Sequence, residues 1–246
     1  MKGDARPLVI SHRTQMGECP ENTLAGIEVA LAQHVDAIEI DVRATADGVP
    51  VLMHDASLAR TTGLDRPLSD LTLADLDAVR VVDPHGCLEP QRVPTLDEAL
   101  AAIGGRALLC IEVKDPGLEA AVARAVRAAG ATGWCWIWAF DPAVVTACHA
   151  ELPEVRVALN AGPGSEARYG YDSPVEAAAR GGSAAVSLAH SLVDAATVEA
   201  AHLRGLMVFT WTVDEPADIA RVLEAGVDGV CSNLPSRVRA ALEGRE

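Results

Sequence analysis

Short, mostly continuous apolar runs recur along the chain and alternate with longer stretches rich in Ala, Leu, Glu and Arg. Runs without polar alternation are typical of parallel strands that are buried on both faces of a sheet. We expect eight strands, at Leu8–His12, Ala37–Val42, Ala107–Val113, Cys135–Phe140, Arg156–Asn160, Ala184–Leu188, Leu206–Thr212 and Gly229–Ser232.

Helix signals lie between these runs. The stretch Leu118–Ala129 has apolar residues on a helical period, and Gly130 follows its end. Further helices are expected to begin at Asn22, Leu96, Asp141, Ser173, Asp194, Glu215 and Ser236. This alternation over 246 residues predicts an α/β fold, a closed TIM (β/α)₈ barrel. An open doubly wound sheet is the alternative, and it would need a glycine-rich GxGxxG turn that the sequence lacks.

The alternation breaks first between Val42 and Val51. The connection is too short for a crossover between parallel strands, which takes a dozen residues or more. Asp47-Gly48 is a turn signal, so we predict a hairpin in which Val49–His54 returns antiparallel along Ala37–Val42. Such a return would bring His54 beside the acidic positions of the first hairpin strand.

The second break is the segment from about residue 56 to 93, which has no regular place in a barrel. It contains a short helical stretch around Leu73–Val79 and the turn-rich Asp83-Pro84-His85-Gly86. No linker-like or low-complexity stretch separates it from the rest. We predict one domain, residues 1–246, with a small inserted cap over one rim of the barrel.

Composition narrows the functional classes. Half of the residues are apolar, so a large core is expected, and the net charge of −15 disfavours nucleic acid or an anionic membrane as a partner. No apolar stretch is long enough to span a membrane, and the N-terminus lacks the apolar segment of a secretory signal. The six cysteines lack CxxC spacing and are expected to be buried, reduced thiols: Cys19, Cys87, Cys110, Cys135, Cys148 and Cys231. We expect a cytoplasmic protein; a secreted form that has lost its signal is the alternative, and a homo-oligomer stays open.

Three acidic residues stand between apolar neighbours in adjacent barrel strands. Glu39 and Asp41 point to the same face of their strand, and Glu112 lies in the next barrel strand. Inward carboxylates repel each other unless a cation neutralises them, and oxygen ligands suit Mg²⁺ or Ca²⁺. Lys114 lies on the same face as Glu112, where it can meet a negatively charged ligand. The alternative for any one of these acids is a rim residue.

Other candidates lie at the ends of the runs. His12 and Arg13 close the first run and His54 ends the hairpin, so an imidazole for proton transfer and a cation are expected near the carboxylates. Trp211 ends the seventh run, where it forms either an apolar wall of a site or part of the core. The alternating residues Trp134, Trp136 and Trp138 are expected to be structural and to pack against helices.

The order and spacing of these residues resemble the glycerophosphodiester phosphodiesterase family over nearly the whole chain. The similar motifs are His12-Arg13, Pro20-Glu21-Asn22-Thr23, Glu39-Ile40-Asp41-Val42, Thr45-Ala46-Asp47-Gly48, His54-Asp55, Arg60-Thr61-Thr62, Pro94-Thr95-Leu96, Glu112-Val113-Lys114, Phe140-Asp141, Trp211-Thr212-Val213 and Gly226-Val227-Asp228-Gly229. The resemblance implies a TIM barrel with an inserted cap and one divalent metal ion.

The resemblance also implies roles for individual residues. Glu39, Asp41 and Glu112 match metal ligands. The acid–base pair matches His12 and His54, and the groups that bind phosphate match Arg13 and Lys114. The implied reaction hydrolyses a glycerophosphodiester to glycerol 3-phosphate and an alcohol. A hydroxyl of the substrate's glycerol attacks first, and water then opens the cyclic phosphate. Which histidine is the acid is left open.

The chain departs from the family pattern in three places. Thr14 stands where the family usually has glycine, His34-Val35-Asp36 replaces Gly-Ala-Asp, and Cys231-Ser232-Asn233 stands where Thr-Asp is common. If position 14 needs a positive φ angle, threonine fits it poorly. Two further hypotheses therefore stay open, a phosphodiesterase resembling lysophospholipase D and a barrel that binds phosphodiesters without cleaving them.

Overall fold

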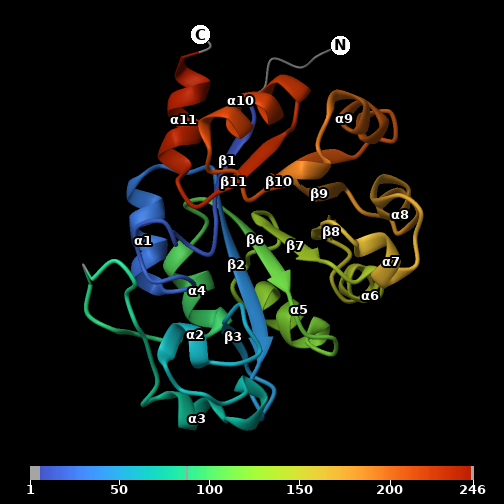
Figure 1. Cartoon of the computed structure of the whole chain (residues 1–246). Helices are drawn as coiled ribbons and strands as arrows, with labels where there is room; N and C mark the ends of the chain where they lie inside the picture. The colour runs from blue at the N-terminus through green and yellow to red at the C-terminus, as the bar shows by residue number, and fades with distance from the viewer. Residues whose placement is uncertain (1–5, 87, 245–246) are drawn as a thin grey trace.

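Eight parallel strands close into a barrel in the computed structural model, which describes residues 6–86 and 88–244 (Figure 1). The strands are β1 Leu8–Ser11, β2 Ala37–Ala44, β6 Leu108–Val113, β7 Cys135–Ala139, β8 Arg156–Ala161, β9 Ala185–Ala189, β10 Met207–Trp211 and β11 Gly229–Ser232. Each is paired with its neighbour in the order β1-β11-β10-β9-β8-β7-β6-β2, and a pairing between β1 and β2 closes the ring. The predicted TIM barrel is confirmed.

Helices cover the outside of the barrel. They are α1 Leu24–Ala32, α4 Leu96–Ile103, α5 Glu119–Ala128, α6 Pro142–Glu151, α7 Ser165–Tyr169, α8 Pro174–Arg180, α9 Ala195–His202, α10 Pro216–Ala225 and α11 Pro235–Glu243, with a short 3₁₀ turn at His190–Leu192. Asp141, Ser173 and Asp194 accept hydrogen bonds from the first turns of α6, α8 and α9, as N-cap residues do. Across residues 6–86 and 88–244, none of the helices has the length and apolar character that crossing a bilayer requires.

The barrel interior is filled by side chains that alternate inward along the strands. This cluster consists of Ile10, Ala37, Cys110, Trp136, Trp138, Ala158, Ala185, Phe209 and Cys231. The ring of Trp138 stacks on Phe209 with centroids 5.4 Å apart. The expectation that Trp136 and Trp138 pack against helices is therefore wrong. Because both faces of a barrel strand are buried, apolar alternation does not tell the inner face from the outer one.

The predicted hairpin is confirmed. Strand β3, Pro50–Leu52, pairs antiparallel with β2, with Val42 opposite Leu52 and Ala44 opposite Pro50. The backbone N–H of Met53 donates to the carbonyl of Asp41 at 3.0 Å, so His54 leaves the hairpin directly beside the acidic positions of β2.

The segment after the hairpin has a small core of its own. It holds α2 Ala59–Thr62, a 3₁₀ turn at Leu68–Asp70, α3 Leu73–Leu76, and the antiparallel pair β4 Arg80–Val81 and β5 Gln91–Arg92. Its buried apolar residues, which include Leu58, Leu68 and Leu76, pack on Val51 and Met53 of the hairpin. In Figure 1 this cap lies at the end toward which β2 points, opposite α10 and α11.

Four of the six cysteines, Cys110, Cys135, Cys148 and Cys231, are buried free thiols, as expected. Cys19 is buried as well. Burial raises the pKa of the Cys135 and Cys148 thiols to about 12, so both stay protonated at neutral pH. The sixth, Cys87, lies outside the described residues.

Candidate active site

A cavity of about 90 Å³ opens at the carboxyl ends of the barrel strands, where TIM barrels carry their sites. Every residue singled out from the sequence lines it: His12, Arg13, Glu39, Asp41, His54, Glu112, Lys114 and Trp211. The remaining lining residues were given no role from the sequence, although Phe140 and Thr212 stood in motifs of the family resemblance: Trp138, Phe140, Asn160, Thr212 and Cys231. The structure thus brings together residues that are up to about 200 positions apart in the chain.

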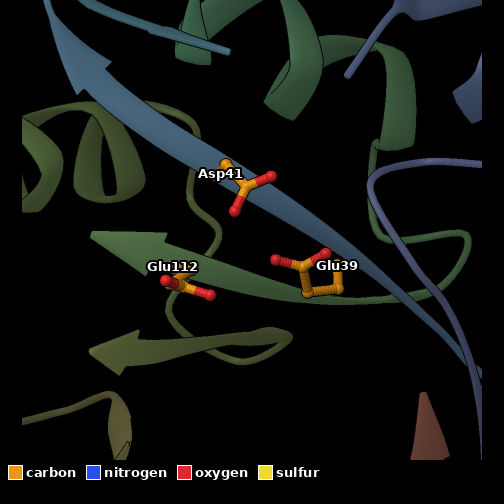
Figure 2. Close-up of side chains that lie close together, drawn as sticks. All are labelled: Glu39, Asp41 and Glu112. Carbon is orange, nitrogen blue, oxygen red and sulfur yellow. The ribbon is translucent and has the colours of Figure 1, made fainter. Parts of the chain in front are cut away.

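Three carboxylates line one side of the cavity. Glu39 and Asp41 extend from β2 and Glu112 from the neighbouring β6, where Asp41 and Glu112 are paired in register (Figure 2). One ligand oxygen of each lies within 4.8 Å of the others, and all three side chains are buried. Burial raises the pKa of Glu39 well above its usual value, and the charges of Asp41 and Glu112 raise it further. Burial likewise raises the pKa of Glu112.

This cluster fits a divalent cation. Two oxygens bound to one Mg²⁺ or Ca²⁺ lie at most about 4 to 5 Å apart, because the metal–oxygen distances are roughly 2.0–2.6 Å. The three ligand oxygens lie within 4.8 Å of one another, which meets this limit for the longer distances of Ca²⁺, and Mg²⁺ would draw them closer together. All donors are oxygen, which suits a hard cation. Bringing three buried carboxylates together without a cation is costly, as the raised pKa values of Glu39 and Glu112 indicate.

Lys114 lies against two of the carboxylates. Its Nζ is 2.9 Å from Asp41 Oδ1 and also donates to Glu112. Burial alone would lower the pKa of Lys114, but Glu112 and Asp41 raise it to about 12, so the side chain stays charged. Burial would raise the pKa of Asp41, yet Lys114 and Arg13 bring it below its usual range.

Arg13 is held on the opposite side of the same acids. Its backbone N–H donates to Glu39 Oε2 at 2.8 Å, and its Nε lies 3.5 Å from Asp41 Oδ2. Its guanidinium also contacts Glu21 at 3.3 Å. Asn22 completes this side, because its amide donates to Asp41 Oδ2 and accepts from the Asp41 backbone N–H. Thr23, and not Asn22, caps α1.

His12 is held by a neutral amide. Its Nδ1 lies 2.6 Å from Asn233 Oδ1, and the Asn233 amide nitrogen donates to Asp214 Oδ2 at 2.7 Å. Asp214 also accepts from the backbone N–H of Asn233 and from the Ser232 hydroxyl. Burial, followed by the charge of Arg13, lowers the pKa of His12 to about 4. His12 is therefore neutral at physiological pH.

His54 is held by a carboxylate. Its Nδ1 lies 2.7 Å from Asp55 Oδ1, and Asp55 in turn accepts from Arg60 Nε at 2.5 Å. Arg60 also donates to both oxygens of Glu21, at 2.6 and 2.7 Å. A side-chain network therefore runs from Arg13 through Glu21, Arg60 and Asp55 to His54. Burial lowers the pKa of His54, against smaller raising effects of the Asp41 charge and of the hydrogen bond to Asp55.

Several supporting residues had no pattern that marks their part in the site. Arg43 donates from Nε to the carbonyl of His54 at 2.8 Å and pairs with Asp115. Asp214 lies behind Asn233. The only sequence signal for such residues was their polar character near the end of a strand. The hydrogen-bond partner of each one depends on which strands become neighbours in the fold. Arg60 and Glu21 stood in motifs of the family resemblance, yet their pairing needs α2 to lie beside the loop between β1 and α1.

The backbone after His12 explains one departure from the family pattern. Arg13 and Thr14 have φ angles of 47° and 70°, so position 14 does need the left-handed conformation that glycine adopts easily. The Thr14 side chain is fully buried and does not line the cavity. It lies instead against α1, where a Cβ atom at Gly26 would come within 2.2 Å of Thr14 Oγ1. The absence of a side chain at Gly26 makes room for the threonine.

An aromatic wall faces the charged side of the cavity. Trp211 packs edge-on against Phe140 with ring centroids 5.4 Å apart, and its Nε1 donates to the carbonyl of Ser187 at 3.2 Å. The Lys114 ammonium lies 5.9 Å from the centroid of Phe140. Both interpretations of Trp211 apply, since it lines the cavity and also packs on the interior cluster.

Comparisons with known proteins agree with this geometry. The Glycerophosphoryl diester phosphodiesterase family model matches residues 12–237. A glycerophosphodiester phosphodiesterase of Caldanaerobacter subterraneus is 30% identical over 240 residues, which cover 94% of this chain and 95% of that protein.

Solved structures are similar over their whole length. The glycerophosphodiester phosphodiesterase from Agrobacterium tumefaciens has a TM-score of 0.81 and 27% identity, covering 96% of this chain and 100% of that one. An Oleispira antarctica phosphodiesterase in complex with the product sn-glycerol-3-phosphate has a TM-score of 0.85 and 26% identity, covering 97% of both chains. The chain belongs to the glycerophosphoryl diester phosphodiesterase family, a family of enzymes that hydrolyse phosphoric diesters.

Proposed function

We propose that this enzyme hydrolyses glycerophosphodiesters to glycerol 3-phosphate and an alcohol, with one divalent cation and a pair of histidines. The observation that carries the proposal is a cluster of three buried carboxylates in the same small cavity as two histidines, each with its Nδ1 already held. The product complex of the Oleispira antarctica relative supports glycerol 3-phosphate as a product.

Glu39, Asp41 and Glu112 would hold the cation, and Mg²⁺ and Ca²⁺ both suit their oxygens. When bound, such an ion supplies Lewis-acid polarisation of a phosphoryl oxygen. Arg13 and Lys114, which line the cavity on either side of Asp41, bind the remaining phosphoryl oxygens and offset the charge that develops on them.

The partners of the histidines support different roles for them. Asn233 directs its amide nitrogen at Asp214, so its oxygen faces His12 and must accept a hydrogen from Nδ1. Neutral His12 then has a free lone pair on Nε2, which suits a general base. His54 donates from Nδ1 to the Asp55 carboxylate, which stabilises the imidazolium form that a general acid needs.

The proton transfers follow from these roles. His12 Nε2 accepts the proton of the attacking glycerol hydroxyl as its oxygen bonds to phosphorus. His54 delivers a proton to the departing alkoxide as the bond between phosphorus and the alcohol oxygen breaks. The products of this step are a cyclic phosphodiester and the free alcohol. Water then opens the cyclic product with the two histidines in exchanged roles, so both return to their starting protonation states.

Removal of the metal tests the proposal. Incubation with EDTA should abolish release of glycerol 3-phosphate from glycerophosphocholine, and added Mg²⁺ or Ca²⁺ should restore it. Product can be followed by ³¹P NMR, which separates the diester, the cyclic intermediate and the monoester. Undiminished turnover in EDTA would remove the metal from the proposal. Binding without any product would favour a non-catalytic barrel instead.

The cap favours a lysophospholipid as a second candidate substrate. Among the described residues, three of the four exposed large apolar side chains belong to it, namely Leu64, Val82 and Leu88. An acyl chain that left the cavity across the cap would cover such residues. A higher kcat/KM for lysophosphatidylcholine than for glycerophosphocholine would favour this activity, and its loss in the Val82→Ser variant would place the chain on the cap.

The proposal also concerns partners and location. We propose a small-molecule phosphodiester as the partner, since the net charge of −15 opposes nucleic acid and anionic membranes. The buried thiols of Cys110, Cys135, Cys148 and Cys231 suit a reducing cytoplasm. Fluorescence imaging and fractionation of cells that express a tagged chain would test the location.

A further inference from the structure

A buried amide lines the cavity opposite the carboxylates. Asn160 lies near the end of β8 and is 1% exposed, yet it is one of the residues that form the cavity wall. Its Oδ1 has no hydrogen-bond partner within residues 6–86 and 88–244. Asn160 points inward because it alternates with Ala158, a member of the interior cluster, and it is paired in register with Ser187 of β9.

A second unmatched polar atom belongs to the same wall. The indole Nε1 of Trp138, on the neighbouring strand β7, is buried and has no acceptor in the described part of the chain. The indole ring is fixed by stacking on Phe209, with an interplanar angle of 22°. The wall therefore combines one N–H donor of fixed position with an amide that offers a donor and an acceptor. Rotation about χ2 of Asn160 can turn either amide atom to the cavity.

Buried polar groups without partners are rare because leaving them unpaired costs free energy. Two of them in one wall, facing a site for polar chemistry, indicate a ligand that supplies the missing partners. We propose that Asn160 and Trp138 bind the vicinal diol of the substrate's glycerol arm. Each hydroxyl of a diol both donates and accepts, so two hydroxyls can satisfy the amide and the indole N–H together.

This inference rests on the proposed function and deepens it. It states that the glycerol half of the diester, and not the head group, lies against the wall of the cavity that contains Trp138 and Asn160. A quaternary ammonium head group has no donor for Asn160 Oδ1. It would also come close to Lys114, whose ammonium already lies over the Phe140 ring. The cavity of about 90 Å³ suits a compact polyol and not a bulky apolar group.

The test compares two phosphomonoesters that differ in the diol. Binding of sn-glycerol 3-phosphate and of methyl phosphate, each in excess Mg²⁺, is measured by calorimetry for the parent enzyme and for Asn160→Leu. The variant should bind glycerol 3-phosphate about 10- to 100-fold more weakly, as expected when hydrogen bonds to a buried group are lost, and should bind methyl phosphate within about twofold of the parent. Asn160→Ala provides the same comparison if leucine is not accommodated.

The matched control is Ser187→Ala. Ser187 is the register neighbour of Asn160, is equally buried, and has a hydroxyl without a partner in the described residues, but it does not line the cavity. This variant should keep the parent's preference for glycerol 3-phosphate. Equal weakening of both ligands in Asn160→Leu, an unchanged preference, or the same loss in Ser187→Ala would overturn the inference.

The binding comparison does not depend on turnover. Glycerophosphocholine hydrolysis, measured in parallel on the parent enzyme, reports on the proposed function alone. A parent that binds glycerol 3-phosphate through Asn160 but releases no product would contradict the phosphodiesterase proposal and leave the diol site standing. A parent that hydrolyses the diester with no change of preference in Asn160→Leu would refute the diol site only.

Discussion

The two histidines of the cavity are held in contrasting ways. His12 follows a central barrel strand and contacts a neutral amide, which is itself fixed by Asp214. His54 follows a hairpin strand outside the closed ring and contacts a carboxylate that belongs to a network reaching the cap. Burial lowers the pKa of both imidazoles, that of His12 to about 4, and only His54 has a carboxylate at Nδ1 that favours its cation. The difference teaches that two identical side chains in one cavity can be prepared for opposite proton transfers by the groups behind them.

The largest expected effect comes from removing either imidazole. His12→Ala and His54→Ala should each lower kcat for glycerophosphocholine by about 10²- to 10⁴-fold, the usual contribution of general acid–base catalysis. Mg²⁺ affinity, measured by calorimetry, should stay near that of the parent because neither histidine is a proposed ligand. A near-normal rate in either variant would remove that residue from the mechanism.

The backbone that carries His12 depends on packing behind it. Gly26→Ala should lower the free energy of unfolding by about 1–3 kcal/mol, because its Cβ atom would overlap the Thr14 hydroxyl. The double variant Thr14→Gly/Gly26→Ala should recover most of this loss, since removing the threonine side chain frees the space and suits the positive φ angle. Urea denaturation of the four proteins measures the coupling, and additive losses would contradict this account of Thr14.

Asp55 and Asn233, which contact the two histidines, should contribute unequally to kcat. Asp55→Asn should lower kcat about 10- to 100-fold, because a hydrogen bond to a charged group contributes about 1.5–3 kcal/mol. Asn233→Ala removes a neutral acceptor and should cost only about 2- to 10-fold. Steady-state kinetics of the two variants give the comparison. The reverse order would contradict the assignment of His54 as the histidine that starts as the imidazolium.

Metal affinity should also depend on pH. Burial and mutual repulsion raise the pKa values of Glu39 and Glu112, so in the metal-free protein their protonated forms extend to higher pH than usual. The cation needs both deprotonated, so its binding releases protons and should tighten as pH rises, by at most about tenfold per pH unit for each proton released. Calorimetry in buffers of different ionisation enthalpy counts these protons. Affinity that does not change between pH 5 and 8 would contradict the shared carboxylate site.

Much of the fold was readable from the sequence because barrel strands are buried on both faces. Continuous apolar runs such as Ala37–Val42 stand out in such a chain, and the observed strand β2 extends that run by two residues. The hairpin was readable from its short connection and its Asp47-Gly48 turn. The sequence did not show which face of a strand points into the barrel. Trp136 and Trp138 were placed wrongly because apolar side chains line both faces of β7.

The candidate site divides in the same way. Carboxylates such as Glu39 between apolar neighbours are conspicuous, so the charged side of the cavity could be predicted. Asn160 at the end of a strand resembles any residue that starts a loop, and nothing local shows that its amide lacks a partner. The pairing of Asn233 with His12 joins residues 221 positions apart, and it exists only because β11 closes the ring against β1.

The most direct test of the contrast between the histidines varies the leaving group. Glycerophosphocholine needs its departing alkoxide protonated, whereas the p-nitrophenyl ester of glycerol 3-phosphate releases a stable phenolate without help. For release of the leaving group in the first turnover, before the cyclic phosphate opens, the rate loss in His54→Ala should shrink from about 10²- to 10⁴-fold to within about tenfold on the p-nitrophenyl ester. The loss in His12→Ala should persist. Rescue of His12→Ala instead, or equal losses on both substrates, would contradict the assignment of base and acid.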